Sequence, residues 1–243
     1  MHLLSYFFRS LLILLLVAPA WPQNHAPSKD TKDLGVGKFL VASRDLRDPN
    51  FARTVIILVQ YGQSGTVGLA INHRTEVSVS EALAEMGTPA RNHPDPVFIG
   101  GPVEAEEVRA LIRKRPAPEL AQHVLNDVYM IWQRKGLERE LKSKANAAVF
   151  RIYLGYCGWG KGQLENEIRT GSWYVFDAAA LGSKQDVFDA DPGTLWNRLI
   201  EKTERRIAYT VQKMGPPATC PHFLSFSLPQ SGQPLRRQYA SLS

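Results

Sequence analysis

The sequence predicts a single α+β domain built on a mixed β-sheet. Short runs of branched apolar residues, typical of buried strands, alternate irregularly with segments that have helical spacing. Two of the runs are separated by a short glycine-containing connection, which is typical of a hairpin. No period of about 20 to 50 residues recurs, so a repeat architecture is excluded. The irregular order also disfavours a purely parallel, doubly wound sheet.

The predicted strands are rich in valine, isoleucine and aromatic residues, which suit a half-buried pleated surface. They cover residues 39–41, 55–59, 67–71, 97–99, 128–132, 148–154 and 174–176. The second and third of them form the hairpin, with Gly62 and Gly65 in its connection.

Capping signals predict the first two helices. Ser78 and Glu81 form a capping box for a helix over residues 81–86, and Gly87 suits its left-handed end. Pro102 favours the first turn of a second helix that continues to about Arg115. In that segment acidic residues come first and basic residues last, which complements a helix dipole.

Three further helices follow along the chain. One covers residues 137–144, and another follows residue 163, where Leu164 and Ile168 share a face. The last begins after Asp191-Pro192, and its buried stripe consists of Leu195, Trp196, Leu199 and Ile200.

The composition is that of a globular protein with a moderate positive charge. There are 29 Lys and Arg against 23 Asp and Glu, a net charge of +6, and 44% of the residues are hydrophobic. These values exclude a disordered, collagen-like or coiled-coil chain. Residues 104–144 contain nine bases and seven acids, so the one-sided charge typical of nucleic-acid binding is missing there. The run 113–115 is interpreted as a solvated helix end in preference to a nucleic-acid patch.

The amino terminus has the pattern of a secretory signal. An apolar run over residues 11–17 follows Arg9 and precedes Ala18-Pro19-Ala20, a small-residue cleavage site. The run is shorter than the about 20 residues that a spanning helix needs. We expect a signal peptide over 1–20, a flexible linker over 21–34, the domain over 35–210 and an irregular extension over 211–243. The protein is therefore expected to be periplasmic or secreted. The alternatives are an uncleaved membrane anchor and a cytoplasmic protein with a misassigned start.

The cysteines and histidines predict little chemistry. Cys157 and Cys220 permit one disulfide in an exported chain, although two unpaired thiols are the preferred interpretation. The chain has no CxxC, HxxxH or HExxH spacing, so no metal site and no cofactor is predicted. It has no GxSxG elbow either, and no catalytic residue is assigned.

The most unusual segment covers residues 155–165. Four glycines in eight residues follow a predicted strand and precede a predicted helix, an order that lets backbone N–H groups approach an anion. Lys161 adds a positive charge, and a thiolate at Cys157 would be stabilised there. However, Lys161 is followed by Gly162 and not by Ser or Thr, so the segment is no P-loop. Tight turns and close packing under Trp159 are the preferred explanation.

Five segments occur in the order and spacing of the AlgH/YqgE family, which the sequence therefore resembles. They cover residues 37–42, 48–55, 68–72, 98–103 and 155–165, and the similarity spans about residues 36–205. The most specific are GGPV at 100–103 and GYCGWGKGQLE at 155–165. The sequence departs from the family in its leader, in His73-Arg74 where Lys-Pro is common, and in its tail.

The resemblance implies a bifurcated, partly closed sheet flanked by helices, and no established reaction. The family's label is that of a transcriptional regulator. The low-specificity candidate binding residues are the matching motif positions together with the rest of the glycine-rich segment: Asn72, Gly100, Gly101, Gly158, Trp159, Gly160, Lys161, Gln163 and Glu165.

Three functions are therefore compared. The preferred one is a non-enzymatic binding or accessory protein, with a cell-envelope protein as a candidate partner. The second is a protein, enzyme or not, that binds a small molecule or anion at the 155–165 segment. The third is the transcriptional regulator of the family's label. An exported protein could not regulate transcription by direct contact with DNA.

Overall fold

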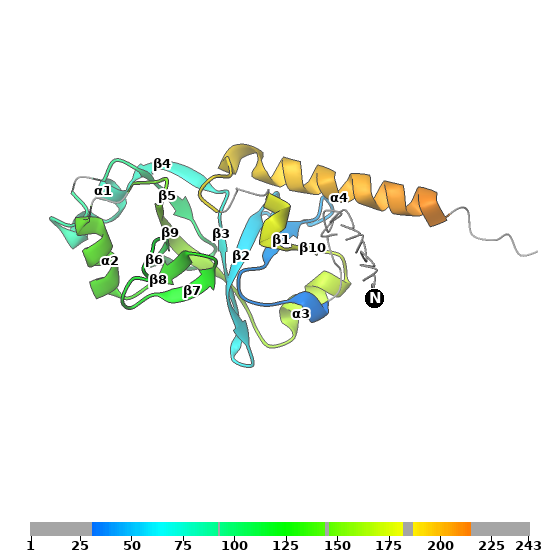
Figure 1. The fold of residues 1–243 in the computed structure, drawn as a ribbon, viewed down its shortest axis with the longest axis horizontal. Coiled ribbons are helices and arrows are strands. Elements are labelled where there is room, and N and C mark those ends of the chain that lie inside the picture. Colours follow the sequence, from blue (N-terminus) through cyan, green and yellow to red (C-terminus); the bar gives the residue numbers. More distant parts are fainter. Residues whose placement is uncertain (1–30, 92, 144–145, 182–186, 215–243) are drawn as a thin grey trace, which may run out of the picture.

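The computed structural model describes residues 31–91, 93–143, 146–181 and 187–214, and it confirms the α+β class (Figure 1). The predicted signal peptide, nearly all of the linker and all but the first residues of the carboxyl-terminal extension lie outside the described residues. Among the helices of the described ranges, none combines the length and apolar character needed to cross a membrane.

Ten strands of the described residues form one large, branched sheet. Its main path runs β10-β1-β2-β3-β9-β6-β8-β7, with antiparallel neighbours throughout. At β9 the sheet branches, because β5 pairs parallel with β9 and antiparallel with β4. The expected bifurcation is thus present, and the sheet is not closed. The strands are β1 (Phe39–Ala42), β2 (Val55–Gly62), β3 (Gly65–Ala70), β4 (Arg74–Ser78), β5 (Pro96–Ile99), β6 (Val103–Arg113), β7 (Gln122–Leu125), β8 (Val128–Ile131), β9 (Phe150–Trp159) and β10 (Trp173–Phe176).

The helix predicted from Pro102 to Arg115 is wrong, because this segment is strand β6. It lies between β8 and β9 and pairs with both of them. Ala110, Leu111 and Ile112 are buried in that central position. The helix-favouring Glu, Ala, Leu and Arg content of the segment is a weak preference that tertiary pairing overrides.

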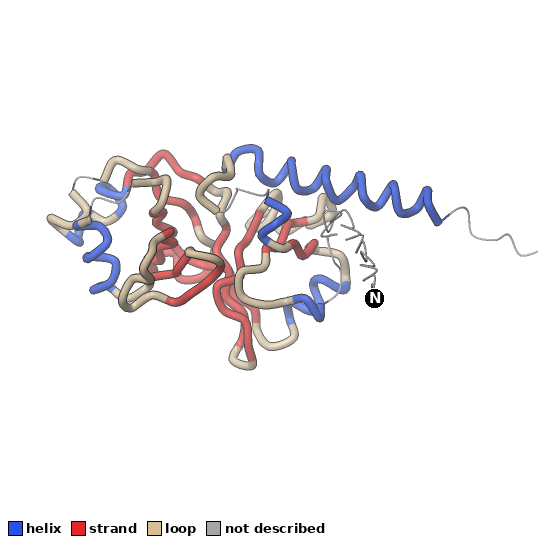
Figure 2. Tube along the Cα trace, in the orientation of Figure 1, coloured by secondary structure: helices blue, strands red, loops and turns tan. Residues whose placement is uncertain are grey.

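Two hydrophobic cores share the central strands. Alternate residues of a strand point to opposite faces of a sheet. Along β9, Tyr153 and Cys157 therefore enter the larger core, while Phe150 and Ile152 enter the smaller one. Figure 2 shows these strands in the middle of the molecule, with helices toward its two ends and along one edge.

The helices close the outer surfaces of both cores. Ser78 caps α1 by accepting a hydrogen bond from the Glu81 N–H, as the capping signal predicted. The helix predicted to run from residue 81 to 86 is divided into α1 and a 3-10 helix, η2, which ends at Gly87 with a φ of 66° and a ψ of −134°. The predicted stripe of α4 is buried, and Trp196 donates a hydrogen bond to Ala42 O at the end of β1. The α-helices are α1 (Val79–Ala82), α2 (Arg134–Lys142), α3 (Gln163–Arg169) and α4 (Pro192–Met214), and the 3-10 helices are η1 (Thr31–Asp33), η2 (Ala84–Met86) and η3 (Ala178–Leu181). Helix α4 continues past residue 210, where the domain was expected to end.

Candidate functional site

The glycine-rich segment is mostly strand. Strand β9 continues to Trp159, so only residues 160–162 form a turn before α3. The prediction of a turn over residues 155–162 was therefore wrong for residues 155–159, which belong to β9. Gly155 has a φ of 66°, and a Cβ there would lie 2.4 Å from Gly101 O, so this glycine permits two backbones to meet. Gly158 pairs with Val67 within the sheet and is exposed.

The turn and helix α3 are held by a carboxylate that sequence reasoning missed. Glu167 accepts hydrogen bonds from the indole N–H groups of Trp159 (2.9 Å) and Trp173 (2.8 Å) and from the Gln163 amide (3.0 Å). The same Gln163 side chain accepts the Gly160 N–H at 3.1 Å. The last Glu of the GQLExE motif was the available signal for this role.

The remaining predicted residues of the turn differ in their surroundings. Glu165 accepts a hydrogen bond of 2.8 Å from the Tyr61 hydroxyl. Burial, followed by this bond, raises the pKa of Tyr61. Lys161 is exposed at the surface. The contacts of Gln163 and Glu165 stabilise the corner between β9 and α3, and anion binding at this corner stays a prediction.

The Gly100-Gly101 turn packs directly on β9. A Cβ at Gly101 would lie 2.2 Å from Tyr156 C, and one at Gly100 would lie 2.4 Å from Gly155 O. Cys157 points into the same junction and donates its Sγ–H to Gly100 O at 3.3 Å. These two glycines are thus close to β9 but are separated along that strand from the Trp159 corner.

The Cys157 thiol is buried and has no disulfide partner among the described residues. Burial raises its pKa to about 12, opposite to the thiolate that a helix start and Lys161 would favour. The proposed partner in a disulfide, Cys220, lies outside the described residues, so that bridge stays a prediction.

Asn72 occupies a third position, between β3 and β4, where its side chain bonds to the loop before β2. Its Oδ1 accepts the Val55 N–H at 2.8 Å, and its Nδ2 donates to Arg53 O at 2.9 Å. The neighbouring His73 Nε2 lies 2.9 Å from Thr54 Oγ1, and burial lowers the pKa of His73. The candidate residues from the sequence are therefore distributed over three places and do not form one site.

A large cavity lies elsewhere, and we call it the β6 cleft. It has a volume of about 610 Å³ and lies between the α1–η2 segment, α2 and the amino-terminal half of β6. Its floor is apolar, its rim carries three carboxylates and one guanidinium, and Trp132 beside it is 40% exposed. A volume of this size suits a ligand or a peptide segment. The lining consists of Ala82, Leu83, Glu85, Met86, Ala105, Glu106, Glu107, Val108, Trp132, Arg134, Leu137 and Leu154.

A bulge of β6 forms one wall of the cleft. The register between β6 and β9 shifts between Val103 and Val108, and Glu104 there has a φ of 47°. Glu107 bonds to Arg109 at 2.8 Å, and that guanidinium stacks on Tyr156 at 4.0 Å. A hydrogen bond with the Glu107 carboxyl raises the pKa of Glu104. The bulge thus places a cluster of charged groups beside an apolar cavity, where pKa shifts are often functional.

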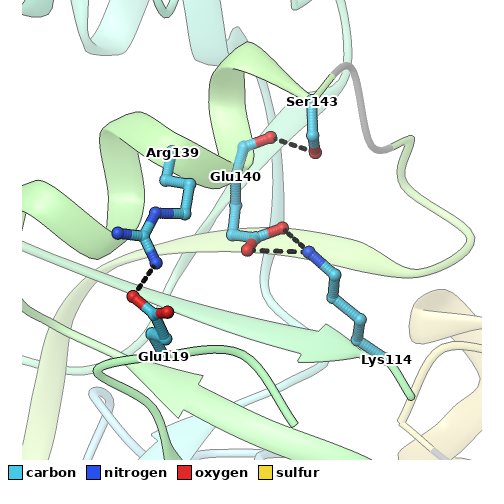
Figure 3. A network of polar contacts seen from close by, with 5 residues as sticks. All are labelled: Lys114, Glu119, Arg139, Glu140 and Ser143. Atoms are coloured by element: carbon cyan, nitrogen blue, oxygen red, sulfur yellow. Dashed lines mark hydrogen bonds and ion pairs between the residues drawn. The ribbon is translucent and has the colours of Figure 1, made fainter. Parts of the chain in front are cut away.

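Ion pairs hold the opposite wall, helix α2 (Figure 3). The buried Glu140 carboxylate receives Lys114 Nζ at 2.7 and 2.9 Å, which ties the helix to the end of β6. Arg139 pairs with Glu119, and the Ser143 hydroxyl donates to Glu140 O at 2.7 Å. These contacts tie α2 to the carboxyl-terminal end of β6 and to the segment that contains Glu119.

A fold with this branched sheet and with the GGPV and GYxGWGxGQLExE segments at its β9 junction defines a family. The family model described as AlgH-like matches residues 39–208. The chain therefore belongs to the AlgH-like family, which confirms the resemblance seen in the sequence.

Individual relatives support the same assignment. A UPF0301 protein of Chlorobaculum tepidum is 31% identical over 174 residues, which cover 71% of this chain and 89% of the relative. A UPF0301 protein of Streptomyces avermitilis is 34% identical over 176 residues, 71% of this chain and 88% of the relative. These names state no activity.

Two solved structures share the fold. The solution structure of the AlgH protein from Pseudomonas aeruginosa has a TM-score of 0.52 and 25% identity, covering 76% of this chain and 94% of that one. A protein from Corynebacterium diphtheriae matches with a TM-score of 0.52 and 24% identity over 64% of this chain and 84% of its own. The second likeness concerns the fold alone.

Proposed function

We propose that the protein is a non-enzymatic binding protein and that the β6 cleft receives a cationic, amphipathic segment of a partner protein. The observation that carries this proposal is the combination of an apolar floor with an acidic rim. Leucine, methionine and valine side chains line the floor, while Glu85, Glu106 and Glu107 lie at the rim. A segment with apolar residues on one side and lysine or arginine beside them is complementary to both features.

The charge balance at the rim favours a basic partner. Arg134 is paired with Glu138 at 2.9 Å, and Glu107 is paired with Arg109. In the described part of the chain, Glu85 and Glu106 have no ion-pair partner. Two carboxylates therefore stay available to a ligand, while the one cation of the rim is already neutralised within the chain.

Trp132 provides an anchor for such a segment. A large aromatic side chain left 40% exposed beside an apolar cavity loses water contact when a partner covers it. Tryptophan is also among the residues most enriched in binding hot spots. Contact with Trp132 is therefore expected to supply a large share of the binding free energy.

The test uses two labelled helical peptides of equal length, one built from leucine and lysine and one from leucine and glutamate. Fluorescence anisotropy should show binding of the leucine–lysine peptide only, and raised salt should weaken it because the rim charges are exposed. Trp132→Ala should weaken binding about tenfold, which corresponds to about 1.4 kcal/mol. Tyr209→Ala removes another exposed aromatic residue, far along α4, and serves as the matched control.

Equal binding of the two peptides, or an unchanged affinity in Trp132→Ala, would remove the cleft from consideration. Catalytic turnover of any substrate that disappears when a cleft or motif residue is changed would contradict the non-enzymatic part of the proposal. The small-molecule alternative at residues 155–165 is tested by ligand-induced stabilisation that Lys161→Ala abolishes.

A nucleic-acid role receives less support from the charges. Each residue of the basic run 113–115, which raised this possibility, forms an ion pair: Arg113 with Asp189 (2.8 Å), Lys114 with Glu140 (2.7 Å), and Arg115 with Asp127 (3.2 Å). Such pairs reduce the positive charge available to phosphates. Duplex-DNA binding with a steep salt dependence would favour this alternative instead.

Export of the protein is a further part of the proposal. It is supported by the apolar run over residues 11–17 and the small residues 18–20 that follow it. Fractionation of the native host with intact-mass measurement tests it: a chain that begins near Trp21 outside the cytoplasm is expected. A cytoplasmic chain without the leader would indicate a misassigned start and make the regulator alternative accessible again.

A further inference from the structure

A second cavity lies far from the β6 cleft, and we call it the arginine pocket. It has a volume of about 180 Å³ and lies between the end of β1, the loop before β2 and the start of α4. Its polar lining consists of Ser43, Arg44 and Arg53, with Trp196 at its wall. The two cavities share no lining residue, and in Figure 1 helix α4 runs along the half of the molecule away from α1 and α2.

The backbone holds Arg53 in an uncommon conformation. Its φ is 56°, in the left-handed region that residues other than glycine rarely adopt. The Asn72 side chain fixes this loop, because it bonds to Arg53 O and to the N–H of Val55. Non-glycine residues in such a conformation persist where the surroundings enforce them, and they are concentrated at binding sites. The motif residue Asn72 thus positions a cation.

The two guanidinium groups converge on one indole ring. Arg44 lies 5.3 Å and Arg53 lies 5.9 Å from the centre of the Trp196 ring. The ring itself is fixed by its hydrogen bond of 2.8 Å to Ala42 O. Two like charges beside one ring repel each other unless an anion lies near both. Glu204 pairs with Arg44, whereas no carboxylate of the described residues pairs with Arg53.

Ser43 adds an unused hydrogen-bonding group to the wall. The residue is 5% exposed, and its hydroxyl oxygen has no hydrogen-bond partner among the described residues. Buried hydroxyl groups are almost always paired, so this hydroxyl would gain a partner if the Ser43 side chain turned toward an anion in the adjacent cavity. A hydroxyl can donate to an oxyanion beside two guanidinium groups.

We propose that the arginine pocket binds the oxyanion group of a small molecule, a phosphate or a carboxylate. Arg53 supplies a positive charge that no carboxylate of the described residues pairs with, and Arg44 shares its charge between the ligand and Glu204. The Ser43 hydroxyl donates a hydrogen bond to the ligand from the wall of the pocket. Glu204 acts as an internal competitor for Arg44. The sequence offered residues 155–165 as the alternative place for an anionic ligand, and this proposal assigns such a ligand to a different part of the fold.

The test measures inorganic phosphate and acetate binding to the full chain by isothermal titration calorimetry, at constant ionic strength. Phosphate is expected to bind, and Arg53→Gln is expected to weaken it at least about tenfold, because a charge-assisted contact is lost. Glu204→Gln is expected to tighten binding, since it releases Arg44. Arg47→Gln removes an exposed arginine of the same loop region that does not line the pocket, and it should leave the affinity unchanged.

The variants distinguish the outcomes. Binding of phosphate alone identifies a phosphoryl ligand, while equal binding of acetate identifies oxyanions in general. The proposal would be overturned if Arg53→Gln leaves phosphate binding intact, if Glu204→Gln does not strengthen it, or if only Lys161→Ala abolishes it. The absence of binding of either anion to the unmodified protein would overturn it as well. The leucine–lysine peptide should still bind Arg53→Gln, so failure of this inference does not affect the β6 cleft.

Discussion

Replacing Gly101 with alanine tests the packing of the GGPV turn on β9. A Cβ at this position would lie 2.2 Å from Tyr156 C, 2.3 Å from Tyr156 O and 2.5 Å from Cys157 N. All three are backbone atoms of a central strand, so no side chain can rotate away. Reaching an ordinary contact of 3.4 Å requires a movement of 3.4 minus 2.2, or about 1.2 Å. Overpacking typically costs about 1 to 3 kcal/mol, and displacement of a paired strand belongs at the upper end.

The expected result for Gly101→Ala is therefore a loss of about 3 kcal/mol in the free energy of unfolding. In a domain of this size that corresponds to a melting temperature lower by roughly 6 to 12 °C. Urea unfolding followed by tryptophan fluorescence measures it. Gly160→Ala is the matched control from the other motif, because a Cβ there would meet only Gln163 Oε1 at 3.9 Å. If both variants unfold within about 0.5 kcal/mol of the unmodified protein, the steric argument is refuted.

The other predictions concern buried polar groups. Glu167→Leu leaves two indole N–H groups without an acceptor, so it should lower the free energy of unfolding by about 2 to 4 kcal/mol and change the tryptophan emission. Unaltered urea unfolding would show that the carboxylate is dispensable. Lys114→Met leaves the buried Glu140 carboxylate without its cation and should lower the free energy of unfolding by about 2 kcal/mol. The loss is smaller than for a fully buried pair because the Lys114 side chain is 40% exposed. Adding Glu140→Gln should recover part of the loss. The free energy of unfolding should fall as pH rises above about 8.5, because the Cys157 thiol of the unfolded chain ionises there while its pKa in the folded protein is about 12. The unfolded state then binds fewer protons than the folded state. If the free energy of unfolding falls with pH as steeply in Cys157→Ser as in the unmodified protein, this prediction is contradicted.

Local patterns predicted the elements whose partners are near in sequence. The β2–β3 hairpin, the cap at Ser78 and the buried stripe of α4 all follow from residues within one or two turns of each other. Strand β6 was missed because its conformation depends on β8 and β9, which lie later in the chain. The hydrophobic alternation that identifies a strand was also masked, since Glu104, Glu106 and Glu107 lie at its bulge.

The candidate sites were harder to predict because they depend on distant contacts. Motif positions such as Gly101 and Gln163 were identified, and the structure shows close packing and turn closure there. The arginine pocket joins residues 43–53 to Trp196, more than 140 positions apart, and no local spacing reports that proximity. The β6 cleft depends on a strand that the sequence assigned to a helix.

The sharing of β9 by two cores limits how this fold can change during evolution. Because neighbouring residues of the strand belong to different cores, neither half can be inherited or duplicated as an independent module. A gene that encoded one half would produce a strand with one apolar face uncovered, and such surfaces promote aggregation. Lineages with this fold are therefore expected to diversify by changing surface loops and rims such as that of the β6 cleft, while the strand order around β9 stays constant.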